Sequence, residues 1–387
     1  MKDQVLYQAC ENMQQEFIVL WERLVNIDTG TGHGEGLNQV AAIVAEQLTQ
    51  LGASIQTIPT ENPVEGSHIV GTFTGQGQGK ILAMAHMDTV FPVGTAAKRP
   101  FTIKDNWVYG PGVSDCKGSI VLFLFAMKVL KMMQYKDYGK ITCLFNCDEE
   151  TTSPHSRHLI TKLAQEHEYT LCMESGQVGD GVVMWRKGSA QMQVEVFGKT
   201  SHAGSNPENG RNAIMEIIHQ MQQISALENL EKLTTLNFTT IKSGDRVNVI
   251  PDYAVAQADI RVLYSDELDR IENMALKLAQ QTLIPDTTVR VSLKRGNPPF
   301  AKNQGTDNLV QLAQEIYGEL GKELIAVGAG GASDANWAAS VGGVTIDGLG
   351  PVKGGKNHTE HECTKLDSVV PRMYLLAKML MRLGAGQ

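Results

Sequence analysis

The sequence predicts an α/β fold with a mostly parallel central sheet flanked by helices, interrupted by an inserted ferredoxin-like α+β domain. Short apolar runs bounded by Gly or Pro, as in residues 79–92, are typical of strands buried on both faces of a parallel sheet. Segments with helical periodicity alternate with these runs. Between residues 188 and 296 the order becomes strand, helix, strand, strand, helix, strand, which is the split βαβ arrangement. We therefore expect a two-part domain, 1–187 with 297–387, and an inserted domain, 188–296.

Hydrophobic periodicity and the positions of Gly and Pro delimit the individual elements. The first domain is expected to contain, in chain order, helices 4–24 and 35–52, strands 67–75 and 81–85, a hairpin at 101–112, helix 119–133, strands 140–147 and 169–173, helix 307–321, strand 344–347 and helix 368–383. The inserted domain is expected to contain strands 191–196, 234–241, 253–263 and 288–294 and helices 212–227 and 266–283. Gly52 is expected to end its helix as the residue after the C-cap. The dense Gly and Pro of 110–118 indicate a tight loop.

Composition and charge exclude several classes of protein. Hydrophobic residues make up 42% and charged residues 20% of the chain, as in an ordinary folded protein. A net charge of −8 argues against nucleic acid or an anionic membrane as the main partner. The six cysteines have no framework spacing, the first residues contain no apolar signal core, and the longest apolar run, 120–127, is too short to span a bilayer. We therefore expect a cytoplasmic protein with free thiols.

The first candidate functional residues are His86 and Asp88, which follow the apolar run 81–85. In open α/β sheets the ligand crevice lies outside the carboxyl ends of the strands, where this pair is expected. Residues two apart on a strand point to the same side, so one side chain can bind a metal while the other orients it. A His-x-Asp pattern alone is weak evidence.

Further side chains of the metal-binding type follow other predicted strands and loops. The complete set is His86, Asp88, Asp115, Glu149, Glu150, Glu174 and His358. Each residue type has an ordinary alternative, since Asp115 could cap a helix and the acids 148–150 could form a solvated turn. Three predicted buried strands end in such residues, however, and a solvated surface is not expected to repeat that pattern.

Two imidazoles and three carboxylates suit a pair of divalent cations, most naturally zinc, with one carboxylate bridging. Cobalt and manganese accept the same nitrogen and oxygen ligands. Such a pair activates a shared water and polarises a carbonyl group. A further carboxylate must then take the proton of the water and pass it to a leaving amine. The residues therefore predict metal-assisted hydrolysis of an amide.

Several motifs resemble a known family of di-zinc peptidases. They are HMDTV (86–90), GPGVSDCKGS (110–119), CDEE (147–150), KTSHAGSNPENGRNA (199–213) and NVIP (248–251), together with Glu174 and the His358 region. The family contains glutamate carboxypeptidases, acetylornithine deacetylases, succinyl-diaminopimelate desuccinylases and aminoacylases. The resemblance covers nearly the whole chain in the same motif order. It is greatest to the bacterial glutamate carboxypeptidases, through KRGNPPF (294–300), GGASDANWAAS (330–340) and the segment 368–386.

The resemblance implies a role for each candidate ligand. Asp115 is expected to bridge the two metals. His86 and Glu174 are expected to complete one site, and Glu150 and His358 the other.

The resemblance also implies roles for the remaining acids. Glu149 is expected to be the general base, and Asp88 the acid that orients His86. A cis peptide bond is expected between Asp115 and Cys116. His361 is the alternative ligand to His358. The family pattern of the loop, His followed by Glu362, favours His358.

For the inserted domain, the resemblance implies a role as lid and dimerisation domain. His202 matches a histidine that reaches the active site of the partner subunit and supports the oxyanion. Asn248 and Arg261 match lid residues that contact substrate, and Arg295 matches an arginine placed to take a substrate carboxylate bidentately. The residues alone leave alternatives open, since Arg261 could pair with Asp259 and His202 could cap a turn.

The main expectation is a homodimeric amidohydrolase or exopeptidase with two zinc ions per subunit that cleaves a small peptide at an amide next to a free carboxylate. An N-acyl amino acid deacylase is the alternative enzyme, with the same metals and a different pocket. A non-catalytic metal-binding protein is the alternative from another class. The presence of Glu149, Asp88 and His202 together argues against it, and a chelator-sensitive hydrolase assay would separate these classes.

Overall fold

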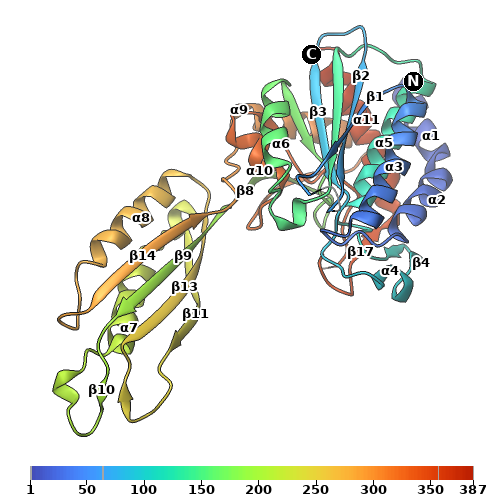
Figure 1. Cartoon of the computed structure of the whole chain (residues 1–387). Helices are drawn as coiled ribbons and strands as arrows, with labels where there is room; N and C mark the ends of the chain where they lie inside the picture. Colours follow the sequence, from blue (N-terminus) through green and yellow to red (C-terminus); the bar gives the residue numbers. More distant parts are fainter. Residues whose placement is uncertain (1, 63–64, 356, 387) are drawn as a thin grey trace. The chain divides into compact units, whose positions relative to one another are not determined.

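The structure is a computed structural model that describes residues 2–62, 65–355 and 357–386. Contacts divide the chain into two units, which are described separately (Figure 1). Unit 1 holds the residues up to Trp185, Lys302–Ala329 and those from Ser333 onward, whereas unit 2 holds Arg186–Ala301 and Gly330–Ala332. None of the helices in the described ranges is long and apolar enough to cross a membrane.

Unit 1 is built on a mixed sheet with the strand order β1-β2-β6-β3-β7-β16. Its strands are β1 (Ser54–Pro59), β2 (Ser67–Thr74), β3 (Lys80–His86), β6 (Lys140–Asn146), β7 (Tyr169–Cys172) and β16 (Val344–Ile346). The last four strands of the order pair in parallel, whereas β2 runs antiparallel to both β1 and β6. The expected parallel sheet is therefore confirmed at its centre, and the antiparallel strands make the whole sheet mixed.

Helices cover both faces of this sheet (Figure 1). They are α1 (Lys2–Asn12), α2 (Gln14–Val25), α3 (Gly34–Leu51), α4 (Thr95–Lys98), α5 (Lys117–Met132), α6 (Arg157–Gln165), α9 (Gln304–Gly318), α10 (Asp334–Ser340) and α11 (Val369–Gly384). On one face α3, α5 and α11 contact the strands, and Phe123 of α5 lies edge-on to Phe145 of β6. On the other face α6 packs with α10. α5 is buried around nearly its whole circumference because it is almost entirely apolar.

The carboxyl ends of the parallel strands position the candidate site. β3 ends at His86, β6 ends at Asn146 and β7 ends at Cys172. Because these strands are parallel neighbours, the polar residues at and after their ends meet at one edge of the sheet. Smaller sheets complete unit 1, namely β4 (Thr102–Lys104), β5 (Trp107–Tyr109) and β17 (Cys363–Lys365), and the pair β8 (Gly181–Arg186) with β15 (Ile325–Ala329).

Unit 2 has the strand order β11-β13-β9-β14, and all neighbours are antiparallel. Its elements are β9 (Gly188–Phe197), β10 (Ser201–His202), α7 (Ala213–Ser225), β11 (Thr235–Ser243), β12 (Val249–Ile250), β13 (Tyr253–Val262), α8 (Asp266–Leu278) and β14 (Thr288–Arg295). Alternate residues of β13 are buried and form a core with α7 and α8. The order confirms the ferredoxin-like arrangement expected from the sequence.

Some element boundaries differ from the expected ones. α8 ends at Leu278, before the expected end at 283. The residue before a proline avoids the helical conformation, and Ile284 precedes Pro285. The N–H of Ile284 donates instead to Oε2 of Glu216 at 2.7 Å.

Other elements were not predicted at all. β1, β8, α6 and α10 lie in segments to which the sequence analysis gave no helix or strand. The segment expected as one helix, 4–24, consists of α1 and α2 with Met13 between them. Gly52 has a left-handed φ of 102° after α3, which confirms the expected helix end.

Candidate metal centre

The five candidate metal ligands lie on different segments of unit 1. His86 is the last residue of β3, Glu150 lies in the 3₁₀ turn after β6, and Glu174 follows the end of β7. Asp115 lies in the loop before α5, and the peptide bond that follows it is cis, as the resemblance implied. His358 lies in the loop before β17 with a φ of 64°.

His86, Asp115 and Glu174 form the first group that could hold a cation. Nε2 of His86 lies 2.9 Å from Oδ1 of Asp115 and 3.6 Å from Oε1 of Glu174. The thiol of Cys116 is also close, but it donates to the carbonyl oxygen of Met173 at 3.2 Å. Burial raises the pKa of this thiol to about 12, so the thiolate that a metal requires is disfavoured.

Asp115, Glu150 and His358 form the second group. Nε2 of His358 lies 3.1 Å from Oδ2 of Asp115 and 3.2 Å from Oε2 of Glu150. These two hydrogen bonds raise the pKa of His358 to about 10. His361, the alternative ligand, is exposed and lies 3.7 Å from a carboxylate oxygen of Glu360. The structure therefore brings His358 to Asp115.

Asp115 belongs to both groups, with one carboxylate oxygen turned to each histidine. Burial alone would raise its pKa, but the hydrogen bonds with His358 and His86 outweigh burial and hold the pKa of Asp115 well below its usual range. Its N–H donates to Oε1 of Glu362 at 3.1 Å, and its Oδ2 accepts from Nδ2 of Asn357 at 3.0 Å. A supporting role of Glu362 and Asn357 was not predicted, because their position beside His358 in the sequence does not indicate that they contact Asp115.

Asp88 lies buried behind His86 and connects the two groups. Its carboxylate is 3.4 Å from Nδ1 of His86, and its own carbonyl oxygen is closer to that nitrogen, at 3.0 Å. The carboxylate accepts from Oγ1 of Thr31 at 2.7 Å and from the backbone N–H groups of Glu149 and Glu150 at 3.2 Å and 3.1 Å. Thr31 was missed because a threonine in a Gly-rich loop carries no distinctive pattern.

Glu149 is the candidate general base. Burial raises the pKa of its carboxyl group well above the usual value, while His86 opposes the shift and Glu174 adds to it. The pKa of Glu150 is also raised by burial, against the hydrogen bond from His358. A carboxyl group whose pKa is shifted towards neutrality is suited to accept and return a proton.

His202 and Asn248 lie at one end of unit 2. β10 pairs with β12, and the N–H of Ala203 donates to the carbonyl oxygen of Asn248 at 2.9 Å. Nδ1 of His202 accepts from the backbone N–H groups of Gly204 and Ser205 at 3.1 Å and 3.0 Å. His202 therefore caps a turn, which was the structural alternative, and its side chain is exposed.

Arg261 and Arg295 lie at the opposite end of unit 2, on its four-stranded sheet. Arg261 is opposite Ser189 of β9, and Arg295 is opposite Ala190. Successive residues of a strand point to opposite faces, so the two arginines lie on different faces of the sheet. Within unit 2, the structure does not bring Asn248, Arg261 and Arg295 together.

Both arginines already have acidic partners. Nε of Arg261 donates to Oδ2 of Asp259 at 2.9 Å, which is the pairing left open by the sequence. Nη2 of Arg295 donates to Asp269 and Glu272 of α8 at 2.7 Å and 2.8 Å.

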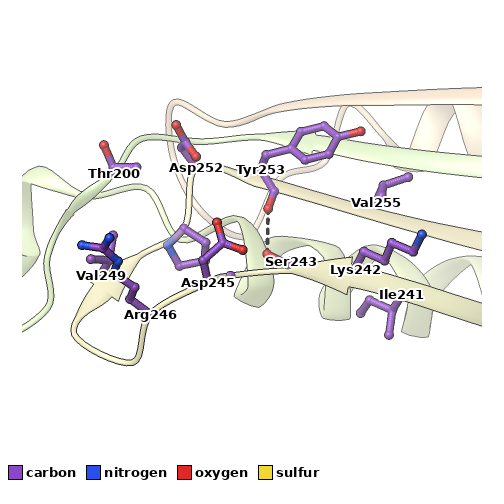
Figure 2. Close-up of a pocket in the computed structure, with 12 residues that line it drawn as sticks. Thr200, Ile241, Lys242, Ser243, Asp245, Arg246, Val249, Asp252, Tyr253 and Val255 are labelled. Atoms are coloured by element: carbon purple, nitrogen blue, oxygen red, sulfur yellow. Dashed lines mark hydrogen bonds between the residues drawn. The ribbon is translucent and has the colours of Figure 1, made fainter.

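Unit 2 contains a cavity of about 890 Å³ beside the end of β11 and the start of β13. Figure 2 shows side chains that line it. Oγ of Ser243 donates to the carbonyl oxygen of Tyr253 at 2.7 Å on its wall. Side chains of both signs line it, including Lys242, Arg246 and Asp245. Mixed charge gives the cavity no preference for an anion or a cation.

Comparisons with known proteins identify the family of this chain. A model of peptidase family M20/M25/M40 matches residues 82–382. Carboxypeptidase G2 of a Pseudomonas species is 36% identical, over 100% of this chain and 94% of the relative. Acetylornithine deacetylase of Vibrio parahaemolyticus is 30% identical, over 68% of this chain and 73% of the relative.

A solved aminopeptidase of Bacillus cereus has a TM-score of 0.81 at 22% identity, over 96% of this chain and 98% of that one, which shows a shared fold. The family match spans more than half of the chain, and the full-length relative exceeds 30% identity. This chain therefore belongs to peptidase family M20/M25/M40 and is a metal-dependent hydrolase.

Proposed function

We propose that this hydrolase is an exopeptidase that binds two zinc ions and cleaves the amide bond next to a free carboxylate of a small peptide. The shared position of Asp115 carries the proposal, because its carboxylate oxygens lie 2.9 Å from Nε2 of His86 and 3.1 Å from Nε2 of His358. A carboxylate between two imidazoles, with further acids beside each, is typical of a bridged pair of cations.

The donor atoms fit divalent cations. Imidazole nitrogens and carboxylate oxygens are ligands that zinc accepts, as do cobalt and manganese. Oε1 of Glu150 is buried and has no hydrogen-bond partner among the described residues, so this carboxylate retains an acceptor for a cation. One ion would be held by His86, Asp115 and Glu174, and the other by Asp115, Glu150 and His358.

Each remaining residue then has a separate task. A bound pair of zinc ions supplies an acidified water and a polarised carbonyl. Glu149 would take the proton from the attacking water and return it to the nitrogen of the leaving amine. Asp88 would hold Nδ1 of His86 and so keep Nε2 directed at the first ion.

Recognition of the substrate carboxylate requires local cations, because a net charge of −8 gives an anion no general attraction. Arg295, Arg261 and Asn248 are the proposed contacts. Their positions in unit 2 favour separate contacts over a single fork. A substrate carboxylate at Arg295 would compete with Asp269 and Glu272, which already accept from its guanidinium.

The substrate assignment is tested with a matched pair of peptides that differ only by amidation of the C-terminal carboxylate. Loss of a charge-assisted hydrogen bond is expected to lower kcat/KM by about tenfold or more. Arg295→Ala should remove much of that difference. Equal turnover of the acid and the amide by the wild-type enzyme would rule out carboxylate recognition.

An N-acyl amino acid deacylase is the second candidate, and the acetylornithine deacetylase relative favours it. Both candidates need the same metal ligands. A panel of N-acyl amino acids and dipeptides separates them, since a deacylase would prefer short acyl groups and an exopeptidase would prefer aminoacyl groups.

A homodimer through unit 2 is also proposed, with His202 acting at the site of the second copy. β11 is an edge strand of its sheet, and Ile241 on β11 and Met215 and Ile218 on α7 are exposed apolar side chains. An edge strand with apolar neighbours favours pairing with a second copy across a two-fold axis. Mixing inactive His202→Ala and Glu149→Ala chains should restore one working site per hybrid dimer, and no recovery after confirmed exchange would contradict the proposal.

A cytoplasmic location remains a prediction, supported by six buried free cysteines. Cell fractionation with an antibody to the chain checks it.

A further inference from the structure

The segment 330–340, GGASDANWAAS, is one of the motifs that resemble the bacterial glutamate carboxypeptidases. The proposed function assigns no role to it. It contains Ser333, the N-cap of α10, and Asp334, the first residue of that helix, and both are 3% exposed. A capping serine and an acid at a helix start are ordinary stabilising features. They explain the residue types but not where the two side chains reach.

Asp334 holds the segment that carries Glu149 and Glu150. Its Oδ1 accepts from Oγ of Ser153 at 2.5 Å, and its Oδ2 accepts from Nδ2 of Asn146 at 2.7 Å. Asn146 is the last residue of β6 and Ser153 follows the 3₁₀ turn, so one carboxylate holds both ends of the segment. Ser153 has a φ of 54°, a conformation that residues other than glycine seldom adopt and that this hydrogen bond supports.

Asn146 extends the same connection to the first metal group. Its carbonyl oxygen accepts from the N–H of Met87, the residue between His86 and Asp88, at 2.8 Å. Its Nδ2 also donates to Oγ of Ser156 at 2.9 Å, and that hydroxyl donates to Oδ1 of Asp148 at 2.6 Å. The side chain of Asp334 is therefore joined to a network that runs behind both ends of the glutamate pair.

Ser333 is connected to the backbone of Glu174 through the side chain of Asp347. Its Oγ donates to Oδ2 of Asp347 at 2.8 Å. Oδ1 of Asp347 accepts from the backbone N–H of Glu174 at 3.3 Å and from that of Gly348 at 2.5 Å. Ser333 thus holds the chain just after β7, where Glu174 lies.

We infer that Ser333 and Asp334 are positioning residues of the metal centre. Asp334 fixes the segment with Glu149 and Glu150, while Ser333 fixes the backbone at Glu174 through Asp347. The start of α10 thereby sets the spacing between carboxylates that come from two different strands. The inference rests on the proposed roles of these three glutamates. The positions of these carboxylates matter for catalysis, since a misplacement of about 1 Å in an active site can cost about 10²-fold in rate.

The test compares Asp334→Asn and Ser333→Ala with two matched controls. Each test variant is expected to lower kcat by about 10–100-fold with little change in KM, and to lower zinc affinity in a chelator competition by a similar factor. Asp307→Asn is the first control, because Asp307 also lies in the first turn of a unit 1 helix but pairs with Lys302 on the surface. Ser340→Ala is the second control, since its hydroxyl donates locally, to the carbonyl oxygen of Trp337 in the same helix.

A double-mutant cycle tests the route from Asp334. Ser153→Ala removes the same hydrogen bond from the other side, so it serves even if Asp334→Asn does not fold. The double variant is expected to lose about as much kcat as the more impaired of the two single variants, because both changes remove the same hydrogen bond. Fully additive losses would show that Asp334 does not act through Ser153.

The outcomes separate this inference from the proposed function. Wild-type kcat and zinc affinity in folded Asp334→Asn, Ser153→Ala and Ser333→Ala would overturn the positioning role, even if Glu149→Gln is inactive. Equal losses in Asp307→Asn would overturn it as well, since they would indicate a general effect of helix starts. Full activity of Glu149→Gln would instead contradict the proposed function.

Discussion

Glu267 in unit 2 is fully buried and Glu149 in unit 1 is partly buried, and the surroundings of these two glutamates differ. The carboxylate of Glu267 accepts from Arg270 at 2.7 Å, from Lys232 at 3.0 Å and from Thr234 at 3.1 Å. The hydrogen bond with Arg270 is the largest cause that lowers the pKa of Glu267 to about 2. Burial instead raises the pKa of Glu149 well above its usual value, and Glu174 adds to the shift.

The difference suits the two glutamates to different roles. The charge of Glu267 stabilises unit 2, whereas the surroundings of Glu149 in unit 1 favour proton transfer. Unit 2 surrounds its buried anion with donors, so the ionised form stabilises the fold. Unit 1 gathers five acids, Asp88, Asp115, Glu149, Glu150 and Glu174, around two histidines. Like charges in a buried place destabilise a fold unless cations join them. Such an unbalanced cluster is typical of a functional site.

The largest expected effect is on catalysis at Glu149. Glu149→Gln should lower kcat by about 10²–10⁴-fold while the proposed pair of metal ions is retained, because the amide cannot accept the proton of the water. Steady-state kinetics with metal analysis measures both. Glu267→Gln is the matched change of a buried glutamate and should leave kcat near that of the wild type. Near-normal turnover in Glu149→Gln would show that the two glutamates do not differ in this way.

Metal removal should affect the two units unequally. Free zinc at about 100 times its Kd is expected to stabilise the unit that binds it by about 2.7 kcal/mol. Hydrogen exchange with and without chelator should therefore show lost protection at β3 and α5 of unit 1 and little change at α7 and α8 of unit 2. An equal loss in both units would contradict a metal centre confined to unit 1.

The next effect concerns the stability of unit 2. Glu267→Gln should cost about 1–3 kcal/mol in urea unfolding, because hydrogen bonds to a charged group are lost in the interior. The cost stays moderate since Arg270 and Lys232 are partly exposed and can be rehydrated. Asp266→Asn, on the surface beside it, should change stability by no more than about 0.5 kcal/mol. Equal costs at both positions would remove the contrast.

The smallest effect is the pH dependence of that stability. The pKa of Glu267 is lowered from 4.5 to about 2, so its contribution is fully present above pH 4.5 and is lost as the pH falls through 2. The gap in unfolding free energy between wild type and Glu267→Gln should therefore shrink from pH 5 towards pH 2. A gap that stays constant over this range would show that the carboxylate is not responsible.

Much of the fold followed from the sequence because its signals are local. The apolar run before His86 and the acids after β6 and β7 mark strand ends without any knowledge of packing. α10 was missed because the glycines before Ser333 suggested only a loop, although Ser333 and Asn336 form a capping box that marks a helix start.

The supports of the site are less predictable because they depend on contacts between distant segments. Ser153 and Asp334 are 181 residues apart, and nothing local connects them. The placement of Arg261 and Arg295 on opposite faces of the sheet could have been predicted from period-2 alternation, however. Arg295 continues the apolar face of β14 after Leu293, whereas Arg261 shares the polar face of β13 with Asp259. Alternation thus predicts opposite faces, as the structure shows.

The central claim is that two cations share Asp115. Anomalous X-ray diffraction from crystals grown with zinc tests it most directly, because it locates the ions independently of any assumed ligand. We expect two peaks, about 3.5–4 Å apart as in bridged two-metal sites, one beside His86 and Glu174 and the other beside Glu150 and His358. One oxygen of Asp115 should contact each peak. A single peak, a ligand contact from His361 in place of His358, or Asp115 without contact to either ion would contradict the claim.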